Sequence, residues 1–188
     1  IGLDNLIDGR LEAFVAEARE FNAKAAAMKG DRADEPDPRT PAGLIAHRTG
    51  LSKRPDPEGP PAEEVMAEAG GREVPVRVTM PQGGQPRGVY LEIHGGGFYM
   101  SWAARSDYRN RSTADAAQVA VVSVDYRLAP EHPWPAAPDD CETAALWVLE
   151  QAEERFGTSR LSIGGGSAGA NLAMTTLLRL RDKGRAEP

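Results

Sequence analysis

Short apolar runs alternate with longer helix-forming segments after about residue 70, and this alternation limits the fold more than any other feature. The runs have strand length and are rich in β-branched residues. They cover residues 74–80, 88–93, 119–124 and 161–163, and the helix-forming segments cover 138–156 and 168–180. Strands that alternate with helices build βαβ units with right-handed crossovers, and hence a mostly parallel sheet with helices on both faces. The sequence therefore predicts the α/β class.

Length, charge and cysteine content exclude several classes of function. The 188 residues suffice for one well-cored domain, and 28 acidic against 22 basic residues give a net charge of −6, which disfavours nucleic acid as a partner. No apolar run approaches the ~20 residues that span a bilayer. The single cysteine, Cys141, and three scattered histidines favour neither a disulfide nor a zinc site. We expect no metal, no membrane insertion and a cytoplasmic location.

The first 62 residues differ from the rest of the chain. Apolar residues from Leu3 to Met28 recur with helical spacing, and Gly30 ends this amphipathic helix. Seven prolines between residues 31 and 62 favour extended backbone, so that only Pro41–Leu51 has room for another short helix. We predict a helical segment with a proline-rich linker over 1–62 and an α/β body over 63–188.

Two glycine-rich loops follow predicted strands, at the edge where parallel sheets bind ligands. They read His94-Gly-Gly-Gly-Phe98 and Gly164-Gly-Gly-Ser-Ala-Gly-Ala-Asn171. The second satisfies G-x-S-x-G through Gly165, Ser167 and Gly169, the pattern of a nucleophile on a sharp turn between strand and helix. Residues two before and two after the serine must be small because strand and helix crowd there. The pattern predicts that Ser167 projects its hydroxyl into a cleft.

Other interpretations of these glycines are weaker. Gly164, Gly166 and Gly169 also satisfy G-x-G-x-x-G, but the charged stretch 179–185 is not the strand ending in an acid that a dinucleotide site requires. No Gly-Lys-Ser/Thr follows, which excludes a P-loop. Tight packing alone remains an alternative for this cluster. The first loop favours catalysis, because a His-Gly-Gly-Gly loop after a strand matches an oxyanion hole, and we expect His94 to brace that loop rather than act as a base.

Together with the block Asp125-Tyr-Arg-Leu-Ala-Pro-Glu-His-Pro-Trp-Pro-Ala136, these loops resemble the three signature blocks of the hormone-sensitive-lipase-like (bacterial family IV) esterases, which have the α/β-hydrolase fold. The resemblance runs from about Val74 to Arg185. It implies that Ser167 is the nucleophile and that the N-terminal helices are the first part of a cap. The oxyanion hole that it implies consists of the backbone N–H groups of Gly95, Gly96 and Ala168.

The resemblance also suggests roles for neighbouring residues. Asp125 and Arg127 are expected to tie down the loop beneath the site. Phe98 and Trp134 are expected to be buried in the core, with a place in the pocket wall as the alternative. One position departs from the family, which often has Asp before the nucleophile where this chain has Gly166. This departure puts a supporting hydrogen-bond network in doubt, but not the nucleophile.

Two groups of the expected catalytic triad are absent. In this fold the triad acid and histidine follow the serine, yet only two acidic residues and no histidine follow Ser167. His47, in the cap-like segment, and His132, in the central block, are poor substitutes. We therefore expect the chain to be the N-terminal part of a longer esterase, with an incomplete core that ends after the nucleophile helix and a strand at 161–163 left as an unpaired edge.

The sequence predicts a serine carboxylesterase that, in the longer protein, hydrolyses small to medium acyl esters through an acyl-serine intermediate without a cofactor. The alternatives are a non-catalytic ligand-binding protein on the same scaffold, as in the plant gibberellin receptor, and a pseudoenzyme fragment that pairs with another chain. A histidine outside this chain would favour the enzyme. Amidase or acyl-transfer activity, acyl and alcohol preference and homo-oligomerisation remain open.

Overall fold

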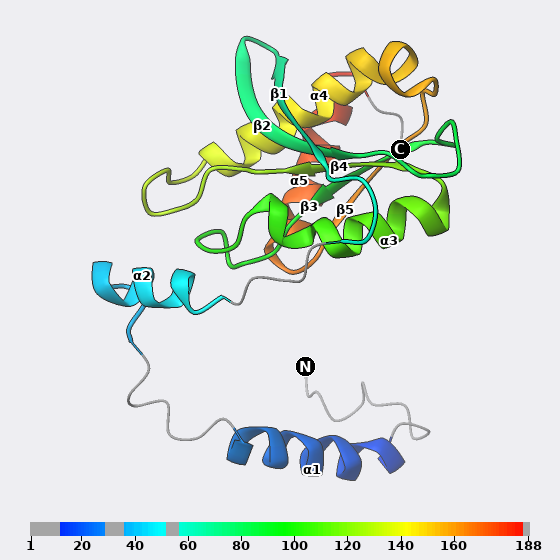
Figure 1. Ribbon diagram of the computed structural model, residues 1–188. Helices are drawn as coiled ribbons and strands as arrows, with labels where there is room; N and C mark the ends of the chain where they lie inside the picture. Colours follow the sequence, from blue (N-terminus) through cyan, green and yellow to red (C-terminus); the bar gives the residue numbers. More distant parts are fainter. Residues whose placement is uncertain (1–11, 29–35, 52–56, 186–188) are drawn as a thin grey trace. The chain divides into compact units, whose positions relative to one another are not determined.

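The computed structural model describes residues 12–28, 36–51 and 57–185 (Figure 1). The chain forms two compact units, 1–47 and 48–188. The first unit contains helix α1, Glu12–Met28. The part of the predicted amphipathic helix before residue 12 lies outside the described residues. The assignment of 1–62 to a cap segment and of 63–188 to the core stays a prediction.

The predicted short helix is confirmed as α2, Pro41–Thr49, which crosses the boundary between the units. Its start follows from local chemistry. The Thr40 hydroxyl accepts the N–H of Gly43 at 3.1 Å, and Pro41 occupies the first helical position, where a missing N–H costs nothing.

The second unit is built on a five-stranded mixed sheet with the order β1-β2-β4-β3-β5. The strands are β1 Glu63–Ala69, β2 Arg72–Thr79, β3 Val89–Ile93, β4 Ala120–Val124 and β5 Leu161–Gly165. β4, β3 and β5 are parallel, whereas β1 and β2 form an antiparallel hairpin that joins the sheet beside β4. The α/β class is therefore confirmed, with an antiparallel edge in addition.

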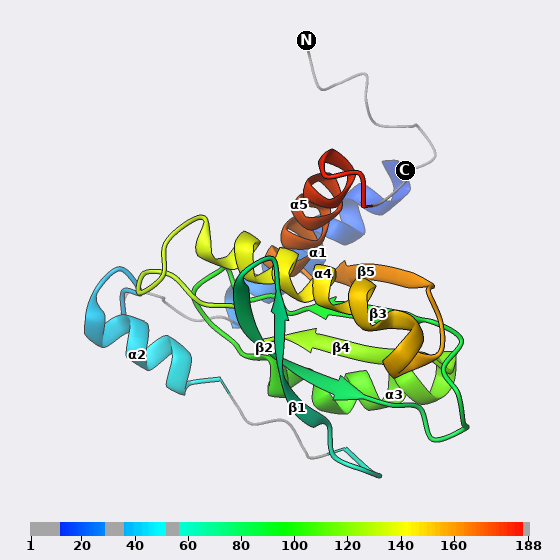
Figure 2. The same cartoon turned by 90° about the horizontal axis from the view of Figure 1, so that it is seen from above.

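Three helices cover the two faces of this sheet (Figure 2). Helix α3, Asp107–Ala117, lies on one face behind a short 3₁₀ helix, η4, Ala103–Ser106. Helices α4, Ala136–Phe156, and α5, Ala168–Asp182, lie on the other face and pack against each other. The helix-forming segments predicted at 138–156 and 168–180 are α4 and α5.

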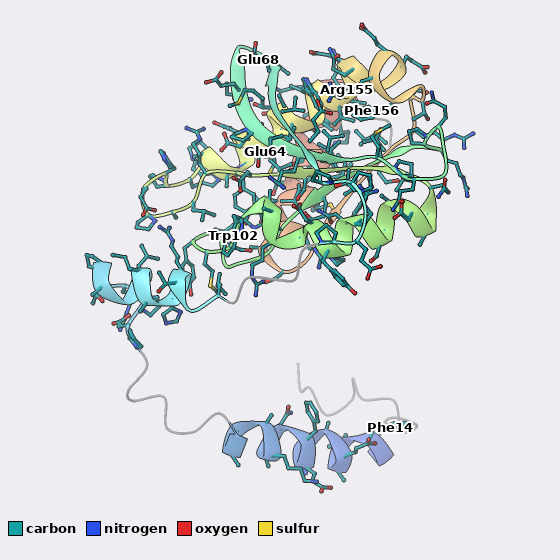
Figure 3. All side chains as sticks on the ribbon, in the orientation of Figure 1. Phe14, Glu64, Glu68, Trp102, Arg155 and Phe156 are labelled. Carbon is teal, nitrogen blue, oxygen red and sulfur yellow. The ribbon has the colours of Figure 1, made fainter. Side chains whose placement is uncertain are left out.

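The core follows from the apolar pattern of these elements. All five residues of β4 are buried, and β2 alternates, with Val74, Val76 and Val78 buried and Pro75 exposed. The predicted stripe of α4 is also buried: Cys141, a free thiol, Ala145, Val148 and Ala152. At the end of α4, Phe156, which Figure 3 labels, lies next to Arg155. Its ring is edge-on to that of Trp147, with centroids 6.2 Å apart.

The register of the sheet sets the place of the candidate site. Ile93, the last residue of β3, pairs with Gly165, the last residue of β5. Because the two strands are parallel, the two glycine-rich loops leave the sheet side by side at its carboxyl edge. β5 stands at the end of the strand order among the described residues, as predicted. No helix in the described part of the chain is long and apolar enough to cross a membrane.

Candidate active site

Ser167 stands on a strained turn between β5 and α5. Its backbone has φ 55° and ψ −119°, far from any region that a residue with a side chain prefers, and the residue is exposed. The turn is held by three hydrogen bonds: the N–H of Gly169 donates to the Gly166 carbonyl at 2.9 Å, and the N–H groups of Ala170 and Asn171 donate to the Ser167 carbonyl at 3.0 and 3.2 Å. The sharp strand-to-helix turn predicted from G-x-S-x-G is confirmed.

The glycines on either side of Ser167 are required by the neighbouring strand. A Cβ on Gly165 would stand 2.2 Å from the carbonyl oxygen of Ile93, and one on Gly169 would stand 1.9 Å from the same oxygen. Both distances are far inside van der Waals contact with rigid backbone. The crowding that the motif implies is therefore the close approach of the nucleophile turn to the end of β3.

The His-Gly-Gly-Gly loop lies against this turn. A Cβ on Gly95 would meet the Gly166 carbonyl oxygen at 2.7 Å and the Ser167 Cβ at 3.4 Å. Gly96 has φ +130° and accepts hydrogen bonds from the N–H groups of Tyr99 and Met100 at 3.1 and 3.0 Å. Within the described residues, the N–H groups of Gly96 and Ala168 donate to no acceptor. Two free backbone donors thus accompany Ser167.

His94 braces the loop, as the sequence predicts. Its buried ring donates from Nδ1 to the Gly95 carbonyl at 2.8 Å and stacks on Tyr126 with ring centroids 4.2 Å apart. The Tyr126 hydroxyl in turn donates to the His94 carbonyl at 2.9 Å. Burial lowers the pKa of His94 below its usual value, so that the ring is neutral. The ring therefore positions the loop backbone, and it forms no hydrogen bond with Ser167.

The predicted structural roles of Asp125 and Arg127 are confirmed. Asp125 accepts the N–H of Ala103 at 2.8 Å, which ties the end of β4 to the segment before α3. The Arg127 guanidinium forms a paired contact with the buried Asp140 carboxylate of α4, with Nη2–Oδ1 2.8 Å and Nε–Oδ2 2.9 Å. Asp140 also accepts the backbone N–H of Arg127 at 2.8 Å. Asp140 belongs to α4 and Arg127 to the loop after β4, so local sequence does not reveal this pair.

The expectation that Phe98 and Trp134 are buried in the core is wrong. Phe98 is 39% exposed and Trp134 is 80% exposed. Phe98 has φ 67° in the loop after β3, and Trp134 stands in the loop before α4, so neither belongs to an element that faces the core. Both line a shallow groove of about 270 Å³ together with His132 and Asn171. The alternative that they line a pocket fits this placement.

No base is brought to Ser167 by the described residues. His132 is exposed in the groove beside Trp134, and no hydrogen bond joins a histidine to Ser167 in that part of the chain. His47 is bonded through Nε2 to the Pro36 carbonyl at 2.9 Å within the first unit. The described ranges also hold no group of three His, Cys, Asp or Glu side chains arranged for a metal ion. Ser167 and two free backbone donors thus lie together, and among the described residues no histidine is bonded to the serine.

Comparison with known proteins identifies the fold family. A family model described as the α/β-hydrolase fold matches residues 90–188. The carboxylic ester hydrolase LipN of Mycobacterium tuberculosis is 41% identical over 117 residues, which are 61% of this chain and 31% of that protein. The carboxylesterase NlhH of the same species is 42% identical over 126 residues, 65% of this chain and 39% of that protein.

Solved structures of esterases also resemble this chain. A bacterial heroin esterase superimposes with a TM-score of 0.66 at 37% identity, over 85% of this chain and 52% of that chain. The chain thus spans between about a third and a half of the proteins that it resembles. The family model matches more than half of the chain, which therefore belongs to the α/β-hydrolase fold family.

Proposed function

We propose that this chain supplies the nucleophile and the oxyanion hole of a serine carboxylesterase that hydrolyses small to medium acyl esters. The observation that carries the proposal is the contact between two loops: Gly95 lies against Ser167, whose strained backbone exposes its hydroxyl at the N-terminus of α5. The carboxylic ester hydrolases among the relatives support the same reaction class.

The reaction follows from this arrangement. Ser167 Oγ attacks the ester carbonyl carbon and gives its proton to a base, and the carbonyl oxygen becomes an alkoxide. The N–H groups of Gly95, Gly96 and Ala168 donate to that alkoxide, at the positive end of the α5 dipole. Collapse of the intermediate expels the alcohol, which takes the proton back from the base. Water then attacks the acyl-serine, releases the carboxylic acid and restores Ser167.

The base and its orienting acid are assigned to a histidine and an acidic residue outside these 188 residues. This assignment rests on chemistry, because a serine hydroxyl is a poor nucleophile without a neighbouring base. His94 is not assigned this role, because its Nδ1 donates to the Gly95 carbonyl and its Nε2 forms no hydrogen bond with Ser167. The reaction as proposed needs no metal or organic cofactor.

A fluorophosphonate probe tests the nucleophile in the complete protein. We expect one probe adduct on the peptide that contains Ser167, and a loss of hydrolysis of 4-nitrophenyl butyrate of at least ~1,000-fold in Ser167→Ala. Ser162→Ala, which removes an exposed hydroxyl from β5, is the matched control and should keep both labelling and turnover. A complete protein that is folded but neither labelled nor active would favour a ligand-binding protein on the same scaffold.

A further inference from the structure

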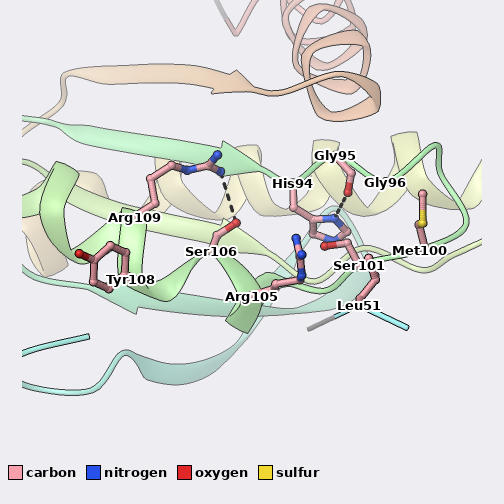
Figure 4. Close-up of a pocket in the computed structure, with 10 residues that line it drawn as sticks. All are labelled: Leu51, His94, Gly95, Gly96, Met100, Ser101, Arg105, Ser106, Tyr108 and Arg109. Atoms are coloured by element: carbon pink, nitrogen blue, oxygen red, sulfur yellow. Dashed lines mark hydrogen bonds between the residues drawn. The ribbon is translucent and has the colours of Figure 1, made fainter. Parts of the chain in front are cut away.

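A second hollow adjoins the oxyanion loop on the α3 side of the sheet (Figure 4). Its volume is about 380 Å³, within the range of small-molecule sites. We call it the arginine pocket; the lining residues used below are His94, Gly95, Gly96, Ser101, Arg105 and Arg109. Figure 4 shows His94, Ser101 and Arg105 clustered beside Gly95 and Gly96, with Arg109 farther along α3.

Within the described part of the chain, Arg105 is a cation without an ion-pair partner at this pocket. Among the described residues it forms no ion pair, and its Nε is buried without a hydrogen-bond partner. A guanidinium is always charged, and a half-buried one is costly to leave unpaired. Arg109, the other arginine of the pocket, has an ion-pair partner, because its Nη2 lies 2.6 Å from the Glu92 carboxylate.

The buried Glu92 does not compensate Arg105. Glu92 Oε1 accepts from Arg109 at 2.6 Å and from the Ser106 hydroxyl at 3.3 Å, and Oε2 accepts from the Ser123 hydroxyl at 2.6 Å. Both of its oxygens are therefore engaged, and Glu92 and Arg109 cancel in charge. His94 adds no charge because its ring is neutral. The wall of the arginine pocket keeps the positive charge of Arg105.

The backbone of the pocket wall is also strained, at Ser101. Ser101 has φ 79°, a left-handed conformation that costs a serine energy and that folds retain mainly at functional positions. The loop that contains Ser101 is anchored at Gly96, whose carbonyl accepts the N–H of Met100 at 3.0 Å. The unpaired Arg105, the hydroxyl-bearing Ser101 and the loop at Gly95 and Gly96 therefore line the same pocket.

We propose that the arginine pocket binds a free carboxylate carried by the substrate, so that the enzyme prefers esters with a carboxylate on their acyl or alcohol part, such as hemi-esters of short dicarboxylic acids. The planar guanidinium of Arg105 matches a carboxylate, which supplies the missing counter-charge. The pocket starts at Gly95 and Gly96, so the carboxylate belongs to the molecule whose carbonyl they hold. This inference rests on the proposed function of the same site.

Matched substrate pairs test the inference in the complete protein. One pair is 4-nitrophenyl hydrogen glutarate and its neutral methyl ester, and the other is 4-acetoxybutyrate and its methyl ester. The measured quantity is the ratio of kcat/KM for the anionic member over the neutral one, in at least one pair. We expect a ratio above ten for the wild type and a fall of about 10- to 100-fold in that ratio for Arg105→Met.

Two further variants separate local binding from other effects of charge. Arg105→Lys keeps the charge but not the planar fork, and should retain part of the preference. Arg160→Met removes a positive charge from the opposite end of the sheet, just before β5, and should leave the ratio unchanged. An equal loss for anionic and neutral esters in Arg105→Met would overturn the inference, because Arg105 would then act on the oxyanion or on folding.

A binding measurement keeps the inference testable if catalysis fails. Calorimetric titration of Ser167→Ala with monomethyl glutarate should show binding that Arg105→Met weakens about 10-fold or more. Wild-type turnover of neutral esters without any preference for the anionic members, and without this binding, would reject the arginine pocket and leave the proposed esterase standing. Binding without turnover or labelling of Ser167 would reject the esterase and retain the pocket.

Discussion

Gly95 and Ser167 lie so close together across the two glycine-rich loops that a methyl group on Gly95 would stand 3.4 Å from Ser167 Cβ and 2.7 Å from the Gly166 carbonyl oxygen. The second distance involves rigid backbone, so a side chain at Gly95 must push its loop away from Ser167. The close approach of the two loops therefore requires that residue 95 has no side chain.

Gly95→Ala should accordingly reduce kcat for ester hydrolysis by about 100-fold, the cost of misplacing an oxyanion donor, with little change in KM. Steady-state kinetics on the complete protein measure both constants. Gly166→Ala is the control, because a Cβ on Gly166 meets nothing within 4 Å. Equal activity in the two variants would mean that the Gly95 loop does not act on the reaction.

His94 should make stability depend on pH below neutrality. Burial lowers its pKa in the folded protein, so the unfolded chain takes up a proton first as the pH falls below the ordinary value of 6.5. The free energy of unfolding should be independent of this group above pH 6.5 and decrease below it. Urea unfolding at several pH values between 7.5 and 5 measures the slope.

His94→Asn isolates this effect, because an asparagine amide can still donate to the Gly95 carbonyl but does not titrate. We expect a flatter pH profile between 6.5 and 5 for this variant than for the wild type. His132→Asn, at an exposed position, serves as the control and should keep the wild-type slope. An unchanged slope in His94→Asn would show that another group causes the acid sensitivity.

Removing the charge of Asp140 should loosen the loop between β4 and α4. Its buried carboxylate holds both the guanidinium and the backbone N–H of Arg127. Because the Arg127 side chain is half exposed, we expect Asp140→Asn to lower the free energy of unfolding by about 2 kcal/mol, less than for a fully buried pair. Asp182→Asn, in an exposed pair with Arg181, should change little by the same urea measurement.

Truncation of Trp147 should lower the stability of the protein far more than truncation of Trp134. Trp147 is buried, lies edge-on to Phe156 and has the Arg155 guanidinium 5.6 Å above its ring, so Trp147→Ala should cost about 3 to 5 kcal/mol of stability. Trp134 is exposed, and Trp134→Ala should change stability by no more than about 0.5 kcal/mol. Thermal unfolding compares both variants. A large loss for Trp134→Ala would mean that polypeptide outside the described residues covers this side chain.

The apolar pattern of the sequence did not predict β1 and α3, for physical reasons. β1, Glu63–Ala69, carries three glutamates and two alanines, which favour helix in isolation, and it becomes a strand because β2 pairs with it along its whole length. α3 has few large apolar residues and buries Asn110, Arg111 and Ala114 instead. Its Arg111 is held by the carbonyl oxygens of Met80 and Pro60, partners that local sequence does not reveal.

Much of the candidate site could be foreseen, because its requirements are local. A strand of alternating or β-branched residues, a glycine where a Cβ would strike the backbone, and a serine between strand and helix are encoded within a few neighbouring residues. Those patterns determined the α/β class, helices α4 and α5, the turn at Ser167 and the bracing by His94. The alignment of the two loops followed from one further rule, that parallel strands end at the same edge.

Tertiary structure alone decided the environment of each charged or aromatic side chain. The pairing of Arg127 with Asp140, the engagement of Glu92 by Arg109, and the exposure of Trp134 depend on which strands and helices become neighbours. Such contacts join residues far apart in sequence, and their energies depend on burial, which no local pattern records. The sequence thus determined where Ser167 and the two glycine-rich loops meet, whereas packing among the described residues left Arg105 beside them without an ion-pair partner.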